Sequence, residues 1–352
     1  MDFISSHFDF KKVDRCIVIG EIGVNHNNNA ELLFKLIDEG IKAGVDIIKL
    51  QRFSADAEIS SYAPKAEYQT LSGPQGESQL EMAKKLQLPD ELIYKAHEYC
   101  KSKNIGFLCA AFDHQSVDFI ADTLKNKTIK VPSPELSNIP LLEHMARKFP
   151  ALLVSTGASY LSECLAAVEL LENQGVQELV LMHCVSEYPA PIEDANLRAI
   201  TTMQQATQLP IGYSDHTVGI TAPIVAASLG SVLIEKHYTL DKTLPGPDHR
   251  ASADIQELAT MVKAVREASL SLGSGLKRPV ESEVKNRPII RKCLVVNNEY
   301  LEAGTSLVTA MLGVKRPEVP GAVLPIDLNK IIGLKLKRAK SYDEPIMWSD
   351  FE

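Results

Sequence analysis

The sequence predicts a (β/α)₈ barrel of the TIM type followed by a small C-terminal module. Short β-branched runs recur through residues 16–272, helical patterns separate them, and the composition changes after Gly275. Strands separated by helices pair in parallel through right-handed crossovers. Eight such units over this length fit the ~250 residues of a typical barrel. A doubly wound sheet is the alternative, but it usually has fewer strands, and no G-x-G-x-x-G follows the first one.

Eight apolar runs are the expected strands, at residues 16–20, 46–50, 106–110, 128–131, 151–155, 179–183, 210–213 and 232–235. The first expected helix, 30–43, repeats apolar residues at helical spacing (Leu32, Leu33, Leu36, Ile37, Ile41) and stops at Gly44. Glycine at that place is a helix C-terminal signal. The same spacing predicts helices at residues 91–102, 116–124, 141–148, 162–173, 196–206, 220–229 and 254–272.

One connection is too long for a simple turn. Residues 52–89 separate the second strand from its helix and contain Pro64 and a Gly- and Pro-rich stretch at 72–76. Long loops in compact domains are usually functional or disordered. At the C-terminal face of a barrel, such a loop is expected to cover or shape the site.

The tail predicts a second domain. The boundaries expected are a barrel over 1–275, a linker over 276–292 and a module over 293–352. Within the module, 292–297 and 331–336 look like strands and 309–312 like one helical turn. A module of about 60 residues is marginal alone and is expected to need packing partners.

Composition narrows the function. Hydrophobic content of 45% and charged content of 23% are those of a globular protein. The net charge of −8 argues against nucleic acid as a partner. Six scattered cysteines without a C-x-x-C indicate reduced thiols in a cytoplasmic protein. Residues 1–10 do not resemble a signal peptide, and no apolar run approaches the ~20 residues of a membrane span.

The expected strand ends carry charged and hydroxyl side chains, and a barrel keeps its active-site groups at those ends. Lysine is almost never buried without a partner. Taken alone, each lysine is therefore more simply explained by an internal ion pair. Two lysines and three serines at one rim instead indicate a cradle for phosphate and carboxylate groups. These residues are Lys49, Lys130, Ser133, Ser155 and Ser214, with Gln51 beside them.

Two histidines close neighbouring strands. His216 follows the seventh run and His237 follows the eighth, so two imidazoles are expected at one rim. Such a pair, with water and oxygen ligands, suits Mn²⁺ or Zn²⁺ with positions open for substrate. Either histidine alone is better explained as a strand-end packing residue. Glu21 and Asp248 are candidates for proton transfer, or alternatively for charge pairing with lysine.

In combination, these stretches resemble the sialic acid synthase family over nearly the whole chain. The family's motifs have counterparts at residues 20–27, 49–51, 63–69, 130–133, 155–157, 183–189, 212–217, 235–241 and 246–249. The tail is similar to the family's antifreeze-like (SAF) module, with Lys315-Arg316-Pro317 at the place of its sugar-contacting arginine.

The resemblance implies condensation of phosphoenolpyruvate with an N-acylated amino sugar, giving a nine-carbon 2-keto acid and phosphate. N-Acetylmannosamine is the expected acceptor and N-acetylneuraminate the product. The implied cofactor is a divalent cation, Mn²⁺ first, with Mg²⁺ or Co²⁺ as alternatives. The implied assembly is a domain-swapped homodimer. The implied roles are His216 and His237 for the metal; Lys49, Gln51, Lys130, Ser133, Ser155 and Ser214 for phosphoenolpyruvate; Glu135, Tyr188, Asp248 and Arg316 (from a second subunit) for the sugar; and Glu21, with Asp248, for the attacking water.

Other readings stay open. The same chemistry fits 2,4-diacetamido-2,4,6-trideoxymannose, a legionaminate synthase acceptor, and fits a 6-phosphorylated sugar less well because residues 63–69 are bacterial in type. A non-catalytic carbohydrate- or ice-binding protein is the alternative of another class, yet the tail has only Thr305 and Thr309 for an ice-binding face. A different phosphoenolpyruvate-aldose condensing barrel would lack the tail module.

The chain departs from the family pattern mainly on the sugar side. Proline stands at 134 where glycine is usual, which fixes φ and removes an N–H. Ser186 stands in place of an asparagine, and the segment after Arg316 is lengthened. Cys109-Ala110-Ala111 and Asn28 also differ. None of these changes removes an expected metal or phosphoenolpyruvate ligand, so the acceptor is the least constrained part.

Overall fold

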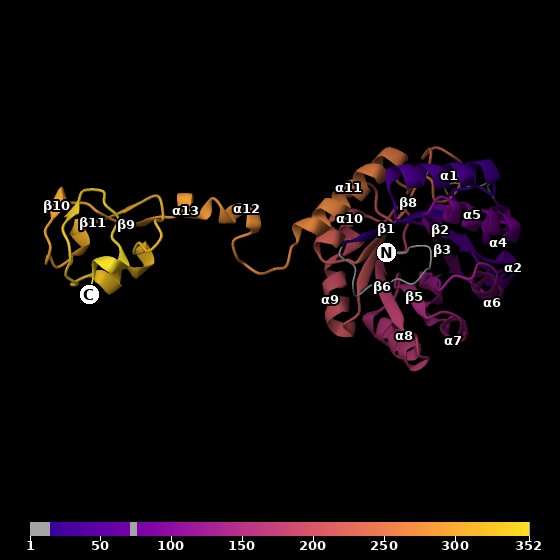
Figure 1. The fold of residues 1–352 in the computed structure, drawn as a ribbon. Coiled ribbons are helices and arrows are strands. Elements are labelled where there is room, and N and C mark those ends of the chain that lie inside the picture. The colour runs from indigo at the N-terminus through magenta and orange to yellow at the C-terminus, as the bar shows by residue number, and fades with distance from the viewer. Residues whose placement is uncertain (1–14, 71–75, 352) are drawn as a thin grey trace. The chain divides into compact units, whose positions relative to one another are not determined.

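The computed structural model describes residues 15–70 and 76–351. The expectation about residues 1–10 and most of the 72–76 stretch lie outside this range. The chain divides into two compact units, Met1–Gly273 and Ser274–Glu352, each described by itself below (Figure 1). Among the described residues, no helix combines the length and apolarity that a membrane crossing requires.

The first unit is a closed barrel of eight parallel strands joined in sequence order, which confirms the predicted fold. The strands begin and end within two or three residues of the expected positions. They are β1 Ile17–Gly23, β2 Ile47–Arg52, β3 Gly106–Ala111, β4 Thr128–Val131, β5 Ala151–Ser155, β6 Glu178–Cys184, β7 Ile211–Asp215 and β8 Leu233–His237. β1 pairs with both β2 and β8, and the pairing with β8 sets Glu21 opposite His237.

Helices follow the strands as predicted. They are α1 Ala30–Ala43, α5 Asp90–Ser102, α6 His114–Asp118 continued by η2 Phe119–Thr123, α7 Ile139–Lys148, α8 Leu161–Asn173, α9 Arg198–Thr207, α10 Thr221–Ser228 and α11 Ile255–Ser271. α1 begins and ends at the residues that the sequence predicted, and its caps show the reason. The Asn29 side chain accepts from the Leu32 N–H at its start, and Gly44 ends it with φ of 89°.

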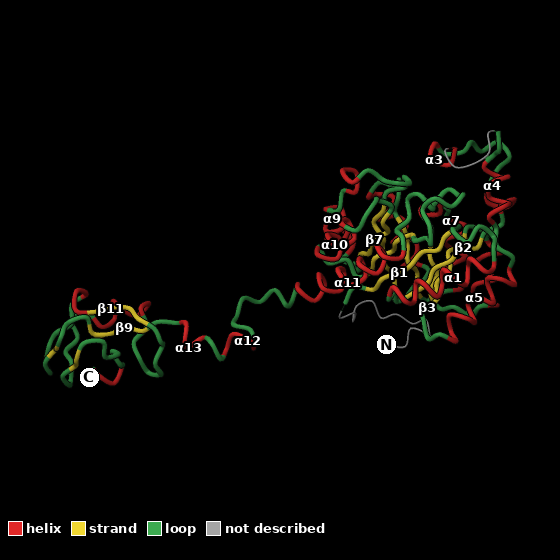
Figure 2. The backbone as a smooth tube through the Cα atoms, turned by 90° about the horizontal axis from the view of Figure 1, so that it is seen from above, coloured by secondary structure: helices red, strands yellow, loops and turns green. Residues whose placement is uncertain are grey.

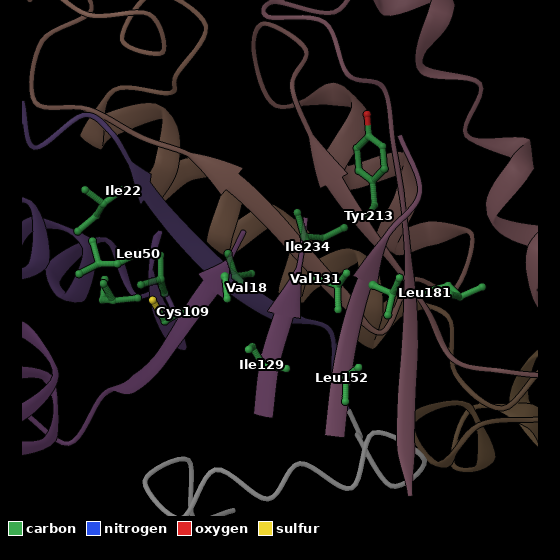
Figure 3. Close-up of a cluster of buried hydrophobic side chains, with 14 of the residues drawn as sticks. Val18, Ile22, Leu50, Cys109, Ile129, Val131, Leu152, Leu181, Tyr213 and Ile234 are labelled. Atoms are coloured by element: carbon green, nitrogen blue, oxygen red, sulfur yellow. The ribbon is translucent and has the colours of Figure 1, made fainter. Parts of the chain in front are cut away.

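Strand alternation divides the barrel's side chains into two sets. Side chains that point outward, such as Val18, Leu50 and Ile129, form a buried cluster with the surrounding helices (Figure 3). Side chains that point inward begin as an apolar layer of Ile17, Ile19, Ile47, Leu108, Leu153, Val180, Met182 and Leu233. The next inward positions toward the C-terminal ends are polar, including Glu21, Lys49, Lys130 and Glu235. The apolar layer closes the barrel beneath the polar one.

The long β2–α5 connection is an ordered insertion where it is described. It contains α2 Ala55–Glu58, α3 Glu67–Thr70 and α4 Gln79–Leu86. Figure 2 shows α3 and α4 extending from the body of the barrel. At its neck, Arg52 forms two hydrogen bonds of 3.0 Å to Asp90. α4 starts with a capping box between Ser78 and Glu81, which fixes the N-terminus of a new helix inside the connection.

The second unit is built on short elements. They are α12 Glu281–Val284, α13 Arg287–Ile290, β9 Cys293–Val296, β10 Tyr300–Leu301, η5 Thr309–Met311, β11 Leu312–Lys315, η6 Pro325–Asp327, α14 Leu328–Ile331, β12 Lys340–Ser341 and η7 Trp348–Asp350. β9 pairs with β11 and β10 with β12, both antiparallel. A small core that includes Leu294, Leu307 and Ile346 holds these pieces together.

One predicted strand of the tail is wrong. Residues 331–336 end α14 and then turn at Gly333, whose φ of 85° breaks an extended run. The segment forms only an isolated antiparallel bridge to residues 305–307, between Ser306 and Lys335, with Gly333 N–H donating to Leu307 O and Leu336 N–H to Thr305 O. The predicted strand at 292–297 and the helical turn at 309–312 are present as β9 and η5.

Candidate active site

A cavity of about 370 Å³ opens at the C-terminal ends of the barrel strands. Eleven of the residues predicted from the sequence line it, drawn from seven strands or the loops that follow them. They are Glu21, Lys49, Gln51, Lys130, Ser133, Ser155, Tyr188, Ser214, His216, His237 and Asp248. The structure therefore brings nearly all of the predicted site together.

Two lysines and two glutamates form an ionic layer across the cavity floor. Lys49 Nζ lies 2.9 Å from Glu21 Oε1 and 3.5 Å from Glu235 Oε1, and Lys130 Nζ lies 3.6 Å from the same Glu235 oxygen. The hydroxyls are tied into this layer. Lys130 donates to Ser155 Oγ at 2.6 Å, and Ser214 Oγ donates to Glu235 Oε1 at 3.1 Å. All four charged side chains are at least 96% buried, so their charges are weakly screened.

The two glutamates of this layer titrate in opposite directions. Burial raises the pKa of Glu21, and the nearby Glu235 charge adds to that effect. Burial also opposes ionisation of Glu235, but Lys130 and Lys49 outweigh it and hold its pKa below the usual range. One oxygen of each carboxyl, Oε2, is buried with no hydrogen-bond partner in the described chain. A raised pKa makes the ionised Glu21 carboxylate a stronger proton acceptor than an exposed one.

His216 and His237 face each other with ring centroids 5.6 Å apart. The Nδ1 atom of His216 lies 2.6 Å from the Val185 carbonyl, which can only accept, so Nδ1 carries the proton and Nε2 has a free lone pair. Burial lowers the pKa of both rings, to about 4 for His216. The neutral imidazole that results is the form that binds metals.

These residues fit a divalent cation. His237 Nδ1 is buried without a hydrogen-bond partner in the described residues, and the nearest carboxylate oxygen, on Asp248, is 3.5 Å away. Within residues 15–70 and 76–351, no group of three or more His, Cys, Asp or Glu side chains is arranged for a metal. The protein would thus offer two nitrogen ligands and leave the other positions to water and substrate.

Small residues make room around this histidine pair. A Cβ at Gly23 would lie 3.0 Å from His237 Cε1 and 3.2 Å from Asp248 Oδ2, and the φ of 54° also favours glycine there. Burial, with the Glu21 charge, raises the pKa of the nearby Asp248 to about 7.

An aromatic ring lies beside the histidine pair. The Tyr188 ring lies 4.1 Å from the His216 ring and 5.1 Å from the Tyr68 ring of α3.

A second glycine opens the serine side of the cavity. The Gly157 N–H donates to Ser133 Oγ at 3.0 Å. A Cβ at that position would lie 2.1 Å from Ser186 Oγ and 2.8 Å from Ser133 Oγ. Ser186 and Pro134, two of the departures from the family pattern, both line the cavity. These departures therefore act on the site itself.

Two predicted residues are not part of this lining. Glu135 lies in η3 Ser133–Ser137, where its Oε2 accepts from Asn138 Nδ2 at 2.6 Å, and Pro134 reaches the cavity in its place. Arg316 follows β11 in the second unit and is exposed there. A contact from Arg316 to the sugar stays a prediction.

Other lining residues were not predicted as site residues. Glu235 could have been found, because it lies two positions before His237 and so faces the same side of β8. Two other residues near strand ends, Lys236 of β8 and His183 of β6, do not line the cavity. Lys236 pairs with Asp215, and His183 bonds the Ala195 carbonyl. The insertion adds a further set of lining residues, including Ile59, Gln69, Gln79, Met82 and Leu86.

The chain is similar to known proteins over most of its length. The sequence model of the NeuB family matches residues 36–277, and that of the SAF domain matches residues 294–352. A relative from Legionella pneumophila named N,N'-diacetyllegionaminic acid synthase is 38% identical over 96% of this chain and 95% of its own length. A Campylobacter jejuni protein of the same name is 40% identical over 86% and 91% of the two chains.

A solved structure is also similar. The N-acetylneuraminic acid synthetase of Leptospira borgpetersenii, crystallised with citrate, matches with a TM-score of 0.69 and 31% identity. The match covers 77% of this chain and 90% of that one.

Proposed function

The chain belongs to the NeuB family, and on that premise we propose that it condenses phosphoenolpyruvate with an open-chain N-acylated amino sugar. The products are a nine-carbon 2-keto acid and phosphate. The observation that carries this proposal is the pairing, in one cavity, of the Lys49–Lys130 layer with the His216–His237 pair. The first is suited to an anionic phosphoryl donor, and the second to a cation that holds an aldehyde.

The donor would lie over the ionic layer. Lys49 and Lys130 offset the charge of its carboxylate and phosphate, while Ser133, Ser155 and Ser214 supply hydroxyl donors. Gln51, whose amide donates to Glu21 at 2.8 Å, holds that carboxyl in place. These groups are held by strand ends and by mutual hydrogen bonds, so they are ordered before the donor arrives.

His216 and His237 would hold a divalent cation, Mn²⁺ or a similar ion. When bound, the cation supplies Lewis acidity at the aldehyde oxygen of the acceptor, where negative charge develops. Asp248 and Tyr188 stand beside the same pair and would contact the sugar. We keep Arg316, from a second subunit of a homodimer, as a proposed further contact to the sugar.

The chemistry requires a water to be directed at one carbon. Carbon 3 of phosphoenolpyruvate bonds to the aldehyde carbon, whose oxygen takes up a proton. Carbon 2 becomes cationic, water adds there, and phosphate leaves with cleavage of the C–O bond. We propose that Glu21 accepts the proton of that water. Its Oε2, which is buried and has no partner within the described chain, supports this role.

For the acceptor we propose 2,4-diacetamido-2,4,6-trideoxymannose, which would give a legionaminic acid. Two relatives at 38% and 40% identity carry that activity in their names. They favour it over N-acetylmannosamine, which was the first expectation from the sequence. N-Acetylmannosamine stays the second candidate because the Leptospira structure is named for that chemistry.

Phosphate release tests the proposal. The protein is incubated with phosphoenolpyruvate, Mn²⁺ and one of three sugars: the diacetamido trideoxy sugar, N-acetylmannosamine or its 6-phosphate. We expect release that depends on the acceptor and is fastest with the first sugar. Release at the same rate without any sugar, or no release with all three, would contradict the proposed function.

A further inference from the structure

We infer that one wall of the cavity selects the acceptor by shielding its methyl groups. The wall consists of Phe53, Ile59, Met82, Leu86 and Phe112, all of which line the cavity, and is called the apolar wall below. The inference rests on the proposed function and deepens it. The groups that the apolar wall would take are the C6 methyl and the second acetamido methyl of a 6-deoxy diacetamido sugar.

Helix α4 presents a single face to the cavity. Gln79, Met82, Ala83 and Leu86 line it and are spaced at i, i+3, i+4 and i+7, the spacing of one helical face. The opposite face carries the exposed residues Glu81, Lys84 and Lys85. The helix is thus amphipathic, and its less polar side faces the ligand space as well as the protein core.

Four of the five residues of the apolar wall, all but Met82, pack in or against one buried cluster. Val24, Phe53, Ala55 and Ala83 form a buried cluster, and Ile59, Leu86 and Phe112 pack against it. The Phe53 and Phe112 rings meet edge to face with centroids 6.1 Å apart. A wall that is already packed does not need to be ordered when a ligand binds, so its contacts contribute to affinity at a low entropic cost.

A polar side chain on the cavity face of α4 matches an amide. Gln79 lines the cavity, and a glutamine side chain both donates and accepts, as an acetamido group does. Gln69 also lines the cavity, but its amide already bonds the Ala66 N–H and the Tyr68 hydroxyl. In the described chain the Gln79 amide makes no side-chain hydrogen bond of its own. It is therefore available to pair with the second acetamido group of the acceptor.

The two candidate acceptors differ where the wall would act. The diacetamido trideoxy sugar has a methyl at C6 and an acetamido group at C4, whereas N-acetylmannosamine has hydroxyls at both places. Hydroxyls facing Met82 and Leu86 would lose water without gaining partners. A methyl in an apolar pocket typically changes discrimination by about 10-fold or more. Two methyls are expected to favour the first sugar by about 100-fold in kcat/KM.

Met82→Gln tests the wall with little change of volume. We expect the ratio of kcat/KM between the two sugars to fall by about tenfold, mainly through loss with the diacetamido sugar, while the KM for phosphoenolpyruvate is unchanged. Met82→Leu keeps an apolar surface and should keep the ratio. Lys84→Ala, on the outer face of the same helix, should keep both kcat/KM values. Thermal melting checks folding, and Ile59→Asn is a second variant from another part of the wall.

An unchanged ratio in Met82→Gln and Ile59→Asn, or an equal loss with both sugars, would overturn the inference while leaving the proposed function standing. If the unmodified protein releases no phosphate with either sugar, the proposed function fails instead. The apolar wall is then tested by calorimetric titration of both sugars onto the phosphoenolpyruvate-loaded protein. If the ratio of the two sugar affinities is the same in the unmodified protein and in Met82→Gln, the inference is overturned.

Discussion

At the scale of single residues, the account depends on Glu21 being a chemical group as well as a partner of Lys49. Its carboxyl accepts from Gln51 at 2.8 Å and pairs with Lys49 at 2.9 Å, but its Oε2 has no partner in the described chain. Glu21→Gln keeps the shape and removes the base. We expect kcat to fall by about 10²–10⁴-fold, with Mn²⁺ affinity nearly unchanged in a calorimetric titration. Turnover like that of the unmodified protein would contradict this role.

The histidine pair makes a separate prediction. His237→Asn removes a buried ring nitrogen that has no other partner among the described residues, so we expect Mn²⁺ affinity to fall by more than about 100-fold, beyond the usual cost of an outer-shell change. His183→Asn is the matched control, because His183 lies near the end of β6, bonds the Ala195 carbonyl and does not line the cavity. Electron paramagnetic resonance of bound Mn²⁺ measures both. Equal affinities in the two variants would remove His237 from the metal site.

Most of the residue-level site could be predicted from the sequence because strand ends in a barrel converge on one space. Lys49, Lys130, Ser155 and Ser214 follow directly from that rule. Glu235 needed the two-residue alternation as well, and applying it would also have set Lys236 aside. Glu135 lies in a short 3₁₀ turn after β4, where the two-residue alternation of a strand does not apply, and its contact to the sugar stays a prediction.

At the scale of elements, the insertion between β2 and α5 lines part of the cavity, and Arg52 anchors its start. Arg52 forms a two-pronged contact with Asp90, donates to Ser116 Oγ at 2.8 Å and lies 5.3 Å from the Phe119 ring. Lysine cannot reproduce this planar fork. Arg52→Lys is therefore expected to raise the acceptor KM by about tenfold through misplacement of the insertion, with the KM for phosphoenolpyruvate unchanged.

Steady-state kinetics with each substrate varied in turn measure this effect. Arg147→Lys is the control, because Arg147 makes only an exposed contact of 3.9 Å to Glu143. Parallel changes in both KM values would mean that Arg52 acts on the whole barrel rather than on the insertion.

The structure of this insertion could not be predicted from the sequence, unlike the barrel around it. The eight strands and their helices follow from hydrophobic periodicity, since each buries one face against a neighbour. The helices α2 and α3 are single turns of four residues, too short to show a helical period. The apolar wall was not predicted because its members come from three separate places, the insertion and the ends of β2 and β3. In the tail, Gly333 turned an apolar run that looked like a strand into a loop.

At the scale of the whole molecule, two units with separate cores imply separate stabilities. Asp350 is central to the second unit. It accepts from the Met347 N–H at 2.7 Å and Arg338 Nε at 2.9 Å, and it pairs with Lys340 Nζ at 2.7 Å. Asp350→Ala removes one carboxylate partner of the buried Lys340, which keeps Glu344 at 3.0 Å and the Pro345 carbonyl at 2.8 Å. Because three charged or polar donors lose their acceptor, we expect the second unit to lose about 1.5–3 kcal/mol of unfolding free energy.

Trp348 reports on this unit alone, because it is the one tryptophan in the sequence. Its fluorescence during urea unfolding should shift to lower urea in Asp350→Ala, while the barrel transition followed by circular dichroism stays in place. Lys330→Ala removes a surface pair and should change the unfolding free energy by less than about 1 kcal/mol. An unshifted Trp348 transition in Asp350→Ala would show that this network does not stabilise the unit.

The pH dependence of the same transition has a defined sign. Burial opposes ionisation of Asp350, but the hydrogen bonds from Lys340, Met347 and Arg338 outweigh it and hold its pKa below the usual range. A depressed carboxyl pKa adds stability above the unfolded-state value of about 4, and that stability is lost as the pH falls through the folded-state value. The urea midpoint of the Trp348 transition should therefore fall as the pH is lowered in the unmodified protein. In Asp350→Ala the midpoint should fall by less.

The central claim is that one cavity joins the enol carbon of phosphoenolpyruvate to an amino-sugar aldehyde and expels phosphate by C–O cleavage. The most direct test uses phosphoenolpyruvate labelled with ¹⁸O at the oxygen that bridges carbon 2 and phosphorus, together with Mn²⁺ and 2,4-diacetamido-2,4,6-trideoxymannose. Mass spectrometry of the phosphate decides the outcome. The account predicts that the label appears in phosphate, and only when the sugar is present. Release of unlabelled phosphate, with the label left in pyruvate, would contradict it.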